Sequence, residues 1–290
     1  NNKQSWIIMG EQSMKKTISL LAAAFLAAAS ILCTGSARAE DKAKDNNKIV
    51  IDGSTTVGPI AKAFVEYYRK QNPGVNITVS ESGSGNGAKS LVNGTCDIAS
   101  MSRFMKDDEV KAAIEKGVVP VCHTVAVDGI AVIVHPSNPM KGLTVAQVRD
   151  IYTGKITNWN EVGGPNARIV VISRDSSSGT YESFETLVMN KEKMASSVEY
   201  VGSSGAIRQR VQSTQGAIGY VGIGFADKTV KTLEIDKIMP TKATIASGRY
   251  PIARPLFLFT NGYPAMGSHL YNFINLYLTR KGQEMIEAIG

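Results

Sequence analysis

The stretch Arg174-Asp175-Ser176-Ser177-Ser178-Gly179-Thr180 is the part of the sequence that most constrains fold and function. It follows the apolar run Ile169-Val170-Val171-Ile172, which is typical of a buried strand. Apolar residues at helical spacing follow it over residues 181–188, so we expect a strand-to-helix turn. Hydroxyls and backbone N–H groups at a helix N-terminus favour an anion, and Arg174 adds a planar fork of donors. Serine and threonine are also common helix caps, so the stretch alone leaves an anion site and a plain cap open.

The beginning of the chain has the pattern of an export signal. Met14-Lys15-Lys16 is followed by an apolar segment over residues 18–32 and by Ala37-Arg38-Ala39, a small-x-small cleavage site. We therefore expect residues 1–39 to be an upstream extension and a signal peptide, cleaved after about Ala39. Residues 40–47 are expected to form a flexible lead-in. The mature protein is predicted to be periplasmic.

Length and charge limit the class of protein further. The 290 residues leave enough chain after the leader for one large or two medium domains with real cores. The formal net charge is +7, part of it in the leader, and no block of Lys and Arg is present. Nucleic acid is therefore not an expected partner. No Cys or His pair has zinc-site spacing, so neither a metal nor another cofactor is expected.

The three cysteines raise two questions. Cys33 is preceded by Leu32, where a lipidation signal needs a small residue, so lipidation is not expected. Cys96 and Cys122 lie at the starts of expected strands. An exported protein permits a disulfide between them, and two buried thiols are the equal alternative.

Strands and helices alternate along the mature chain, which predicts α/β lobes with largely parallel sheets. Expected helices include one capped by Thr144 that runs through Tyr152. Strands are expected at 49–51, 76–80, 97–99, 121–135, 168–173, 198–201, 217–222, 230–235 and 250–260.

Two long apolar β runs, near 125–135 and 250–260, are natural hinge strands. The chain would leave one lobe, build a second and return. Lobe 1 would comprise residues 48–130 and 254–290, and lobe 2 residues 131–253. The cleft between two such lobes is the usual place for a ligand.

Turns rich in Ser, Thr and Gly follow the expected strands, and four of the five open helices. The carboxyl ends of strands in an open α/β sheet lie along one edge, so turns from two facing lobes would converge on one cleft. Hydroxyls, helix N-termini and one or two arginines would then surround a small oxyanion. These turns are residues 53–56, 82–87, 100–103, 174–180 and 202–205.

A series of motifs in a fixed order resembles the periplasmic phosphate-binding proteins of bacterial phosphate ABC transporters, in the compact form of that family. The resemblance covers residues 48–290. It is carried by Asp52-Gly53-Ser54-Thr55-Thr56, Ser82-Gly83-Ser84-Gly85, Asp97-Ile98-Ala99-Ser100-Met101-Ser102-Arg103, residues 128–134, 151–156, Trp159, Gly163-Gly164, 174–180 and Gly216-Ala217-Ile218-Gly219-Tyr220.

The resemblance implies a two-lobed (type II) binding protein, not an enzyme, that closes over inorganic phosphate and docks on membrane permease subunits, as a monomer. Larger members of the family carry an aspartate where this chain has Ser102, and that aspartate accepts the proton of the ligand. Asp175 and then Asp128 are the candidates for this role here, and the protein is expected to prefer phosphate over sulfate. The implied ligand contacts are Ser54, Thr55, Ser84, Ser102, Arg174, Ser178, Gly179 and Thr180, with Thr56, Arg103, Asp128 and Asp175 as further candidates.

Four alternatives to a phosphate-binding protein remain, and one is a receptor or adhesion role without a small ligand, because a fold does not fix a function. Residues 83–90 nearly match a P-loop, with Ala88 where the second glycine belongs, which would suggest a nucleotide hydrolase. A phosphoester hydrolase could use Ser178, although the histidines His123, His135 and His269 form no recognisable arrangement with it. A binding protein for sulfate or molybdate would share the fold and differ in the protonation of its ligand.

Overall fold

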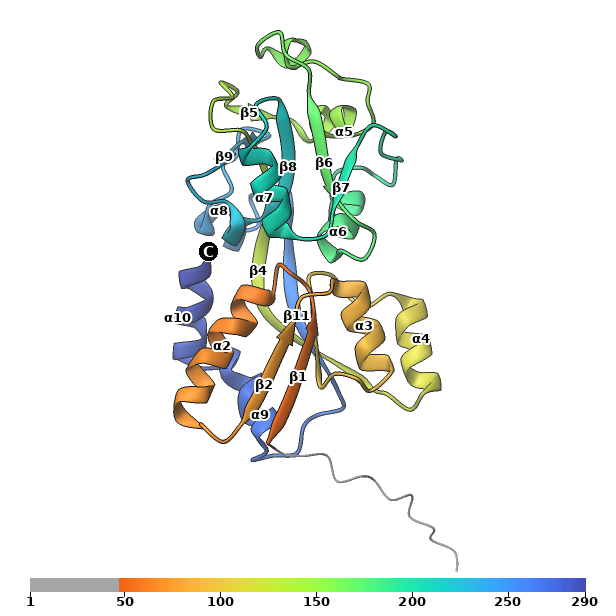
Figure 1. The fold of residues 1–290 in the computed structure, drawn as a ribbon, viewed down its shortest axis with the longest axis vertical. Helices are drawn as coiled ribbons and strands as arrows, with labels where there is room; N and C mark the ends of the chain where they lie inside the picture. The colour runs from red at the N-terminus through yellow and green to blue at the C-terminus, as the bar shows by residue number, and fades with distance from the viewer. Residues whose placement is uncertain (1–46) are drawn as a thin grey trace, which may run out of the picture. The chain divides into compact units, whose positions relative to one another are not determined.

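The computed structural model describes residues 47–290, so the predicted signal peptide and nearly all of the predicted lead-in lie outside the described residues. The strands are β1 (Lys48–Gly53), β2 (Asn76–Ser80), β3 (Ile98–Met101), β4 (Pro120–Val134), β5 (Gly142–Leu143), β6 (Val170–Arg174), β7 (Glu199–Val201), β8 (Ala217–Gly222), β9 (Lys231–Thr232), β10 (Glu234–Ile235) and β11 (Ala253–Asn261) (Figure 1). The α-helices are α2 (Gly58–Gln71), α3 (Ser84–Val92), α4 (Asp107–Glu115), α5 (Val145–Tyr152), α6 (Gly179–Leu187), α7 (Ser204–Gln212), α8 (Lys242–Ala246), α9 (His269–Ile274) and α10 (Arg280–Ile289). Among the described residues, three short 3₁₀ helices cover Trp159–Val162, Ile223–Phe225 and Asn275–Leu278.

One mixed sheet joins most of the strands, in the order β2-β1-β3-β11-β4-β8-β6-β7, with β9 also paired to β4. Pairing is parallel at both ends, where β1 lies between β2 and β3 and where β6 lies between β7 and β8. It is antiparallel in the middle, where β11 pairs with β3 and β4, and β4 pairs with β8. The sheet is therefore less parallel than the sequence predicts, because the chain crosses its middle once outward and once on its return.

The long strand β4 changes partner along its length. Residues 120–129 pair with β11, and residues 130–134 pair with β8. The first part has exposed positions, whereas residues 128–134 are all buried. In Figure 1, β4 and β11 run between the group formed by β1, β2 and α2–α4 and the group formed by β6–β8 and α5–α8.

The apolar cores follow the same two groups of elements. Two clusters draw their buried residues from 49–125 and 256–276, including Phe64, Ile98 and Phe273. Two other clusters draw theirs from residues 130–252, including Trp159 and Tyr220. Each group thus buries its own apolar side chains, as expected of two lobes. The predicted two-lobed α/β fold is confirmed.

One detail of the prediction is wrong, and one question that the sequence left open is decided. Residues 230–235 form two short strands instead of one: β9 pairs with β4 and β10 pairs with β5, with buried Leu233 between them. A disulfide between Cys96 and Cys122 and two buried thiols were the open alternatives. The two cysteines are not bonded to each other, because β11 lies between β3 and β4 and Phe259 of β11 is the partner of Cys122. Cys96 is buried, but Cys122 is exposed. Two strand spacings of about 4.8 Å exceed the reach of a disulfide.

Within residues 47–290, no helix has both the length and the apolar composition needed to cross a bilayer.

Candidate functional site: an anion-binding cluster

The first turn of α6 is built by its capping serine. Ser178 precedes the helix, and its Oγ accepts hydrogen bonds from the backbone N–H groups of Thr180 and Tyr181, both at 3.2 Å. Ser178 and Thr180 are buried. Because two N–H donors occupy the lone pairs of the Ser178 oxygen, its hydroxyl proton must be donated elsewhere. The predicted strand-to-helix turn is confirmed, with the helix beginning at Gly179.

Arg174, the last residue of β6, donates its side-chain hydrogen bonds to neutral oxygen atoms. Its Nε donates to the carbonyl of Val201 at 3.2 Å and its Nη2 to the carbonyl of Gly202 at 2.9 Å. Its Nη1 donates to the hydroxyls of Thr55 (3.0 Å) and Ser204 (3.3 Å). Burial lowers the pKa of the Arg174 guanidinium, an effect that the nearby Asp175 charge opposes.

The Arg174 side chain is 1% exposed and forms no ion pair with any residue in 47–290. A buried charge without a close counter-ion is costly. Asp175, the neighbouring carboxylate, is turned to its own loop: its Oδ1 accepts hydrogen bonds from the backbone N–H and the hydroxyl of Ser177. Arg174 is therefore a buried cation suited to an anionic ligand.

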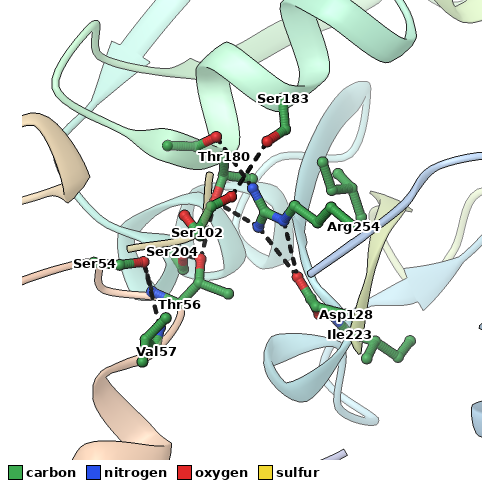
Figure 2. A network of polar contacts seen from close by, with 12 residues as sticks. Ser54, Thr56, Val57, Ser102, Asp128, Thr180, Ser183, Ser204, Ile223 and Arg254 are labelled. Atoms are coloured by element: carbon green, nitrogen blue, oxygen red, sulfur yellow. Dashed lines mark hydrogen bonds and ion pairs between the residues drawn. The ribbon is translucent and has the colours of Figure 1, made fainter. Parts of the chain in front are cut away.

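Hydroxyls from the loop after β1 meet those of α6 and α7. Thr55 Oγ1 lies 3.1 Å from Ser204 Oγ and also accepts a hydrogen bond from the Ser204 N–H. Thr56 Oγ1 lies 2.9 Å from Thr180 Oγ1. Ser54 accepts hydrogen bonds from the N–H groups of the two residues that follow Thr55, so it caps the turn that leads into α2. Figure 2 shows Ser54, Thr56, Thr180 and Ser204 gathered in this network.

Ser84 and Ser102 form the other side of the cluster. Ser84 Oγ accepts a hydrogen bond from the Ser102 N–H at 3.1 Å and lies 3.3 Å from Ser102 Oγ. Gly179 packs directly on this pair: a Cβ atom at that position would lie 2.4 Å from Ser84 Oγ and 2.7 Å from Ser102 Oγ. Only a glycine permits this approach between α6 and α3. The structure thus brings residues from all five predicted turns into one cluster.

Asp128 and Arg254 form a buried ion pair beside the cluster. Both are 5% exposed, and Arg254 Nε and Nη2 lie 3.2 and 3.1 Å from Asp128 Oδ2. Burial raises the pKa of Asp128 above its ordinary value, although Arg254 opposes this shift. Arg254 also donates to Thr180 Oγ1 at 2.9 Å and to the Gly179 carbonyl at 3.2 Å.

Arg103 lies in a separate group of charges. Its two terminal nitrogens each lie 2.7 Å from a carboxylate oxygen of Glu109, and its Nε lies 2.8 Å from Glu182 of α6. Its charge is already offset by two carboxylates, so Arg103 is less available to an anion than Arg174 is.

Ser204 and Arg254 belong to the cluster or contact it, but neither was among the site residues predicted from the sequence. Ser204 stands in one of the five turns, and nothing in its sequence context separates it from Ser203. Arg254 had a usable signal. It interrupts one of the two long apolar β runs, as Asp128 interrupts the other, and charges buried in apolar strands are usually paired.

The catalytic alternatives find little support in the geometry. In the P-loop-like segment, Lys89 is exposed and Ser90 donates to Asp52 at 2.6 Å. The described histidines bond elsewhere: His123 to Thr260, His135 to Ser137 and His269 to Tyr68, and none of the three bonds to Ser178.

Comparison with known proteins identifies the class. A family model for the PBP superfamily domain matches residues 36–281, and the chain belongs to this superfamily. Phosphate-binding protein PstS of Borreliella burgdorferi is 34% identical over 261 residues, which cover 86% of this chain and 91% of that protein. Protein SphX of Synechococcus elongatus is 32% identical over 250 residues, 81% of this chain and 74% of the relative.

Solved structures agree with these relatives. A Clostridium perfringens protein, assigned as a phosphate ABC transporter substrate-binding protein and solved with bound phosphate, is 34% identical. It superposes with a TM-score of 0.78 over 84% of this chain and 98% of its own. An ABC-type phosphate transport receptor from Vibrio cholerae is 33% identical, with a TM-score of 0.68 over 83% of this chain and 98% of its own. The resemblance predicted from the sequence is confirmed.

Proposed function

We propose that this protein captures inorganic phosphate between its two lobes and delivers it, without chemical change, to the permease subunits of an ABC transporter. The observation that carries the proposal is the buried guanidinium of Arg174, whose hydrogen bonds within residues 47–290 all go to neutral oxygen atoms. The relatives named for phosphate binding supply the identity of the anion. Export to the periplasm, delivery to a permease and a monomeric state are parts of the proposal.

The hydroxyls of the cluster are prepared to donate. The side-chain oxygens of Ser54 and Ser178 each accept hydrogen bonds from two backbone N–H groups. The side-chain oxygen of Thr55 accepts hydrogen bonds from Arg174 and from the Ser204 N–H. A hydroxyl whose lone pairs are filled can only offer its proton. Such a group suits a ligand whose surface is made of acceptors, and a tetrahedral oxyanion is one.

The charge balance favours an anion as well. Arg174 and Arg254 bring two positive charges and Asp128 one negative charge, so these three buried side chains carry an excess of one positive charge, which the half-buried Asp175 beside Arg174 offsets only in part. A lowered effective dielectric strengthens attraction to an anion, relative to attraction in water. A cationic or neutral ligand would leave this excess uncompensated.

We also propose that phosphate is preferred over sulfate because phosphate keeps a proton at neutral pH. A fixed acceptor would be left unpaired by sulfate, and its desolvation would go uncompensated. Asp175 is the first candidate for the acceptor, and its Asp175→Asn variant should lose phosphate affinity and tolerate sulfate better. An unchanged ratio of phosphate to sulfate affinity would exclude Asp175.

The proposed lobes are residues 48–130 with 254–290, and residues 131–253. Both contribute hydroxyls to the cluster, as in the contact between Thr56 and Thr180, so closure would complete the anion site. Small-angle scattering should show a more compact protein with phosphate than without it. Identical profiles at saturating phosphate would contradict a closing motion.

The function is tested by calorimetric titration of phosphate-free protein with phosphate, arsenate, sulfate, molybdate and ATP. We expect tight binding of phosphate and arsenate, weaker binding of the other two oxyanions and no binding of ATP. Incubation with a generic phosphoester should release no product, and catalytic turnover that Ser178→Ala abolishes would establish the hydrolase instead. Absence of phosphate binding would refute the proposal.

A further inference from the structure

The ion pair of Asp128 and Arg254 occupies a distinctive place in the fold. The two residues face each other across β4 and β11, the strands that run between the two groups of elements. They lie next to the point where β4 exchanges its partner β11 for β8. Because β4 and β11 connect the two groups of elements, any movement of one lobe relative to the other must bend or twist these two strands.

Arg254 reaches from these strands to the anion cluster. Its side toward β4 holds Asp128, and its other side donates to the carbonyl of Gly179 and the hydroxyl of Thr180, in the first turn of α6. Figure 2 shows the Arg254 side chain between Asp128 and the α6 residues. A single guanidinium therefore ties the α6 N-terminus to the crossing strands.

We propose that Asp128 and Arg254 are a positioning pair that aims the first turn of α6 at the anion, without contacting the anion themselves. The proposal rests on the proposed function and deepens it. Asp128 orients Arg254, Arg254 holds Gly179 and Thr180, and the N–H groups of that turn are fixed in direction. Because Arg254 donates to Thr180 Oγ1, the Thr180 hydroxyl must direct its own proton away from Arg254.

The bonding of Asp128 assigns it a structural part in this pair. Its Oδ2 takes two bonds from Arg254, and its Oδ1 takes the backbone N–H of Ile223 at 3.1 Å. Both oxygens are thus occupied by protein donors. The same carboxylate offsets the charge of Arg254, whereas Arg174 has no such counter-ion among the described residues. The anion therefore belongs with Arg174, and Asp128 and Arg254 act through Gly179 and Thr180.

A positioning role and a purely electrostatic role of the pair predict opposite effects of Asp128→Asn on phosphate affinity. If the pair acted only through its charges, Asp128→Asn would remove a negative charge and tighten phosphate binding. If it acts by positioning, Asp128→Asn frees Arg254 from its orientation and weakens binding. Arg254→Gln weakens binding in both cases, so Asp128→Asn is the informative variant.

The experiment is a double-mutant cycle on phosphate affinity, measured by calorimetry with Asp128→Asn, Arg254→Gln and the double variant. We expect each single variant to weaken binding roughly 10- to 150-fold, the equivalent of one bond to a charged group. The double variant should resemble a single variant, because the pair acts as one unit. Tighter binding by Asp128→Asn, or losses in the double variant that multiply, would overturn the proposal.

The Asp128→Asn variant leaves the buried charge of Arg254 unpaired and could unfold for that reason. Arg254→Lys is a second variant that tests the proposal in that case. Lysine keeps the positive charge beside Asp128, but it lacks the planar guanidinium that bonds both to Asp128 and to Gly179 and Thr180. We expect a melting temperature close to that of the wild type with phosphate affinity at least tenfold weaker. Arg210→Lys is the matched control: Arg210 pairs with Glu199 through two nitrogens, away from Thr180, and should bind as the wild type does.

Wild-type affinity in Arg254→Lys would overturn the positioning role while leaving the proposed function standing. A wild-type protein that binds no oxyanion would instead refute the proposed function, and the positioning role with it. The two failures are therefore distinguishable by the wild-type titration alone.

Discussion

Replacing Arg174 with alanine should cause the largest loss of phosphate affinity of any single substitution in the cluster. The side chain is 1% exposed, has four hydrogen-bonded partners and forms no ion pair with a described residue. Its removal leaves the bound anion without its buried cation. Breaking a buried charge pair costs about 3–5 kcal/mol, which corresponds to a loss in affinity of roughly 150- to 5,000-fold.

Arg174→Lys separates charge from geometry. Lysine retains a positive charge, but a single ammonium group cannot also satisfy the carbonyls of Val201 and Gly202 that now fix the guanidinium. Loss of one charge-assisted bond costs about 1.5–3 kcal/mol, or roughly 10- to 150-fold in affinity. We therefore expect Arg174→Lys to lie between the wild type and Arg174→Ala.

The assay is isothermal titration calorimetry with phosphate-free protein at constant pH and ionic strength. Arg210→Ala serves as the control, because Arg210 is paired with Glu199 and should leave affinity unchanged. Circular dichroism establishes that each variant is folded. Phosphate affinity within threefold of the wild type in a folded Arg174→Ala variant would refute the assignment of Arg174 as the principal anion contact.

Three further substitutions test the cap of α6, the packing of Gly179 and the pH dependence of stability. Ser178→Ala should weaken phosphate binding by about 1–3 kcal/mol, while Ser203→Ala, which also removes a helix cap, should not; equal calorimetric effects would make Ser178 only a cap. Gly179→Ala places a Cβ 2.4 Å from Ser84 Oγ and should reduce affinity strongly, whereas Gly205→Ala, with 3.9 Å of room, should be tolerated; wild-type affinity in Gly179→Ala contradicts this packing. Burial lowers the pKa of His123 below its ordinary 6.5, so the unfolded chain binds more protons. The free energy of unfolding should stay constant with pH above pH 6.5 and decrease as the pH falls below 6.5. Urea titrations of His123→Gln at several pH values should show a smaller decrease. An unchanged dependence of the unfolding free energy on pH in this variant would exclude His123 as the cause.

Helix capping and the spacing of apolar residues predicted most helices and strands of the fold. Thr144 caps α5, accepting a bond from the Gln147 N–H at 3.1 Å, because a threonine before an amphipathic segment can satisfy a helix-end donor. The turn from Arg174 to Thr180 was equally readable, since the change from a β-type to a helical apolar period marks it. Such features depend on neighbours in sequence, which the sequence displays directly.

Features that depend on sheet order were not predictable in the same way. Arg254 pairs with a residue 126 positions away, and the partnership follows from β11 returning beside β4. The same arrangement keeps Cys96 and Cys122 apart, although both begin or precede strands. A strand's partners are decided by the whole topology, so the sequence could name these residues as candidates but could not join them.

The most direct test of the central claim is a crystal structure of the protein grown with phosphate. We expect one phosphate ion within hydrogen-bond distance of the Arg174 guanidinium, the Ser178–Thr180 turn and the Thr55 hydroxyl. Asp128 and Arg254 should still bond to each other and make no contact with the ion. A phosphate bound by one lobe only, or bound away from Arg174, would contradict an anion site centred on Arg174 between the two lobes.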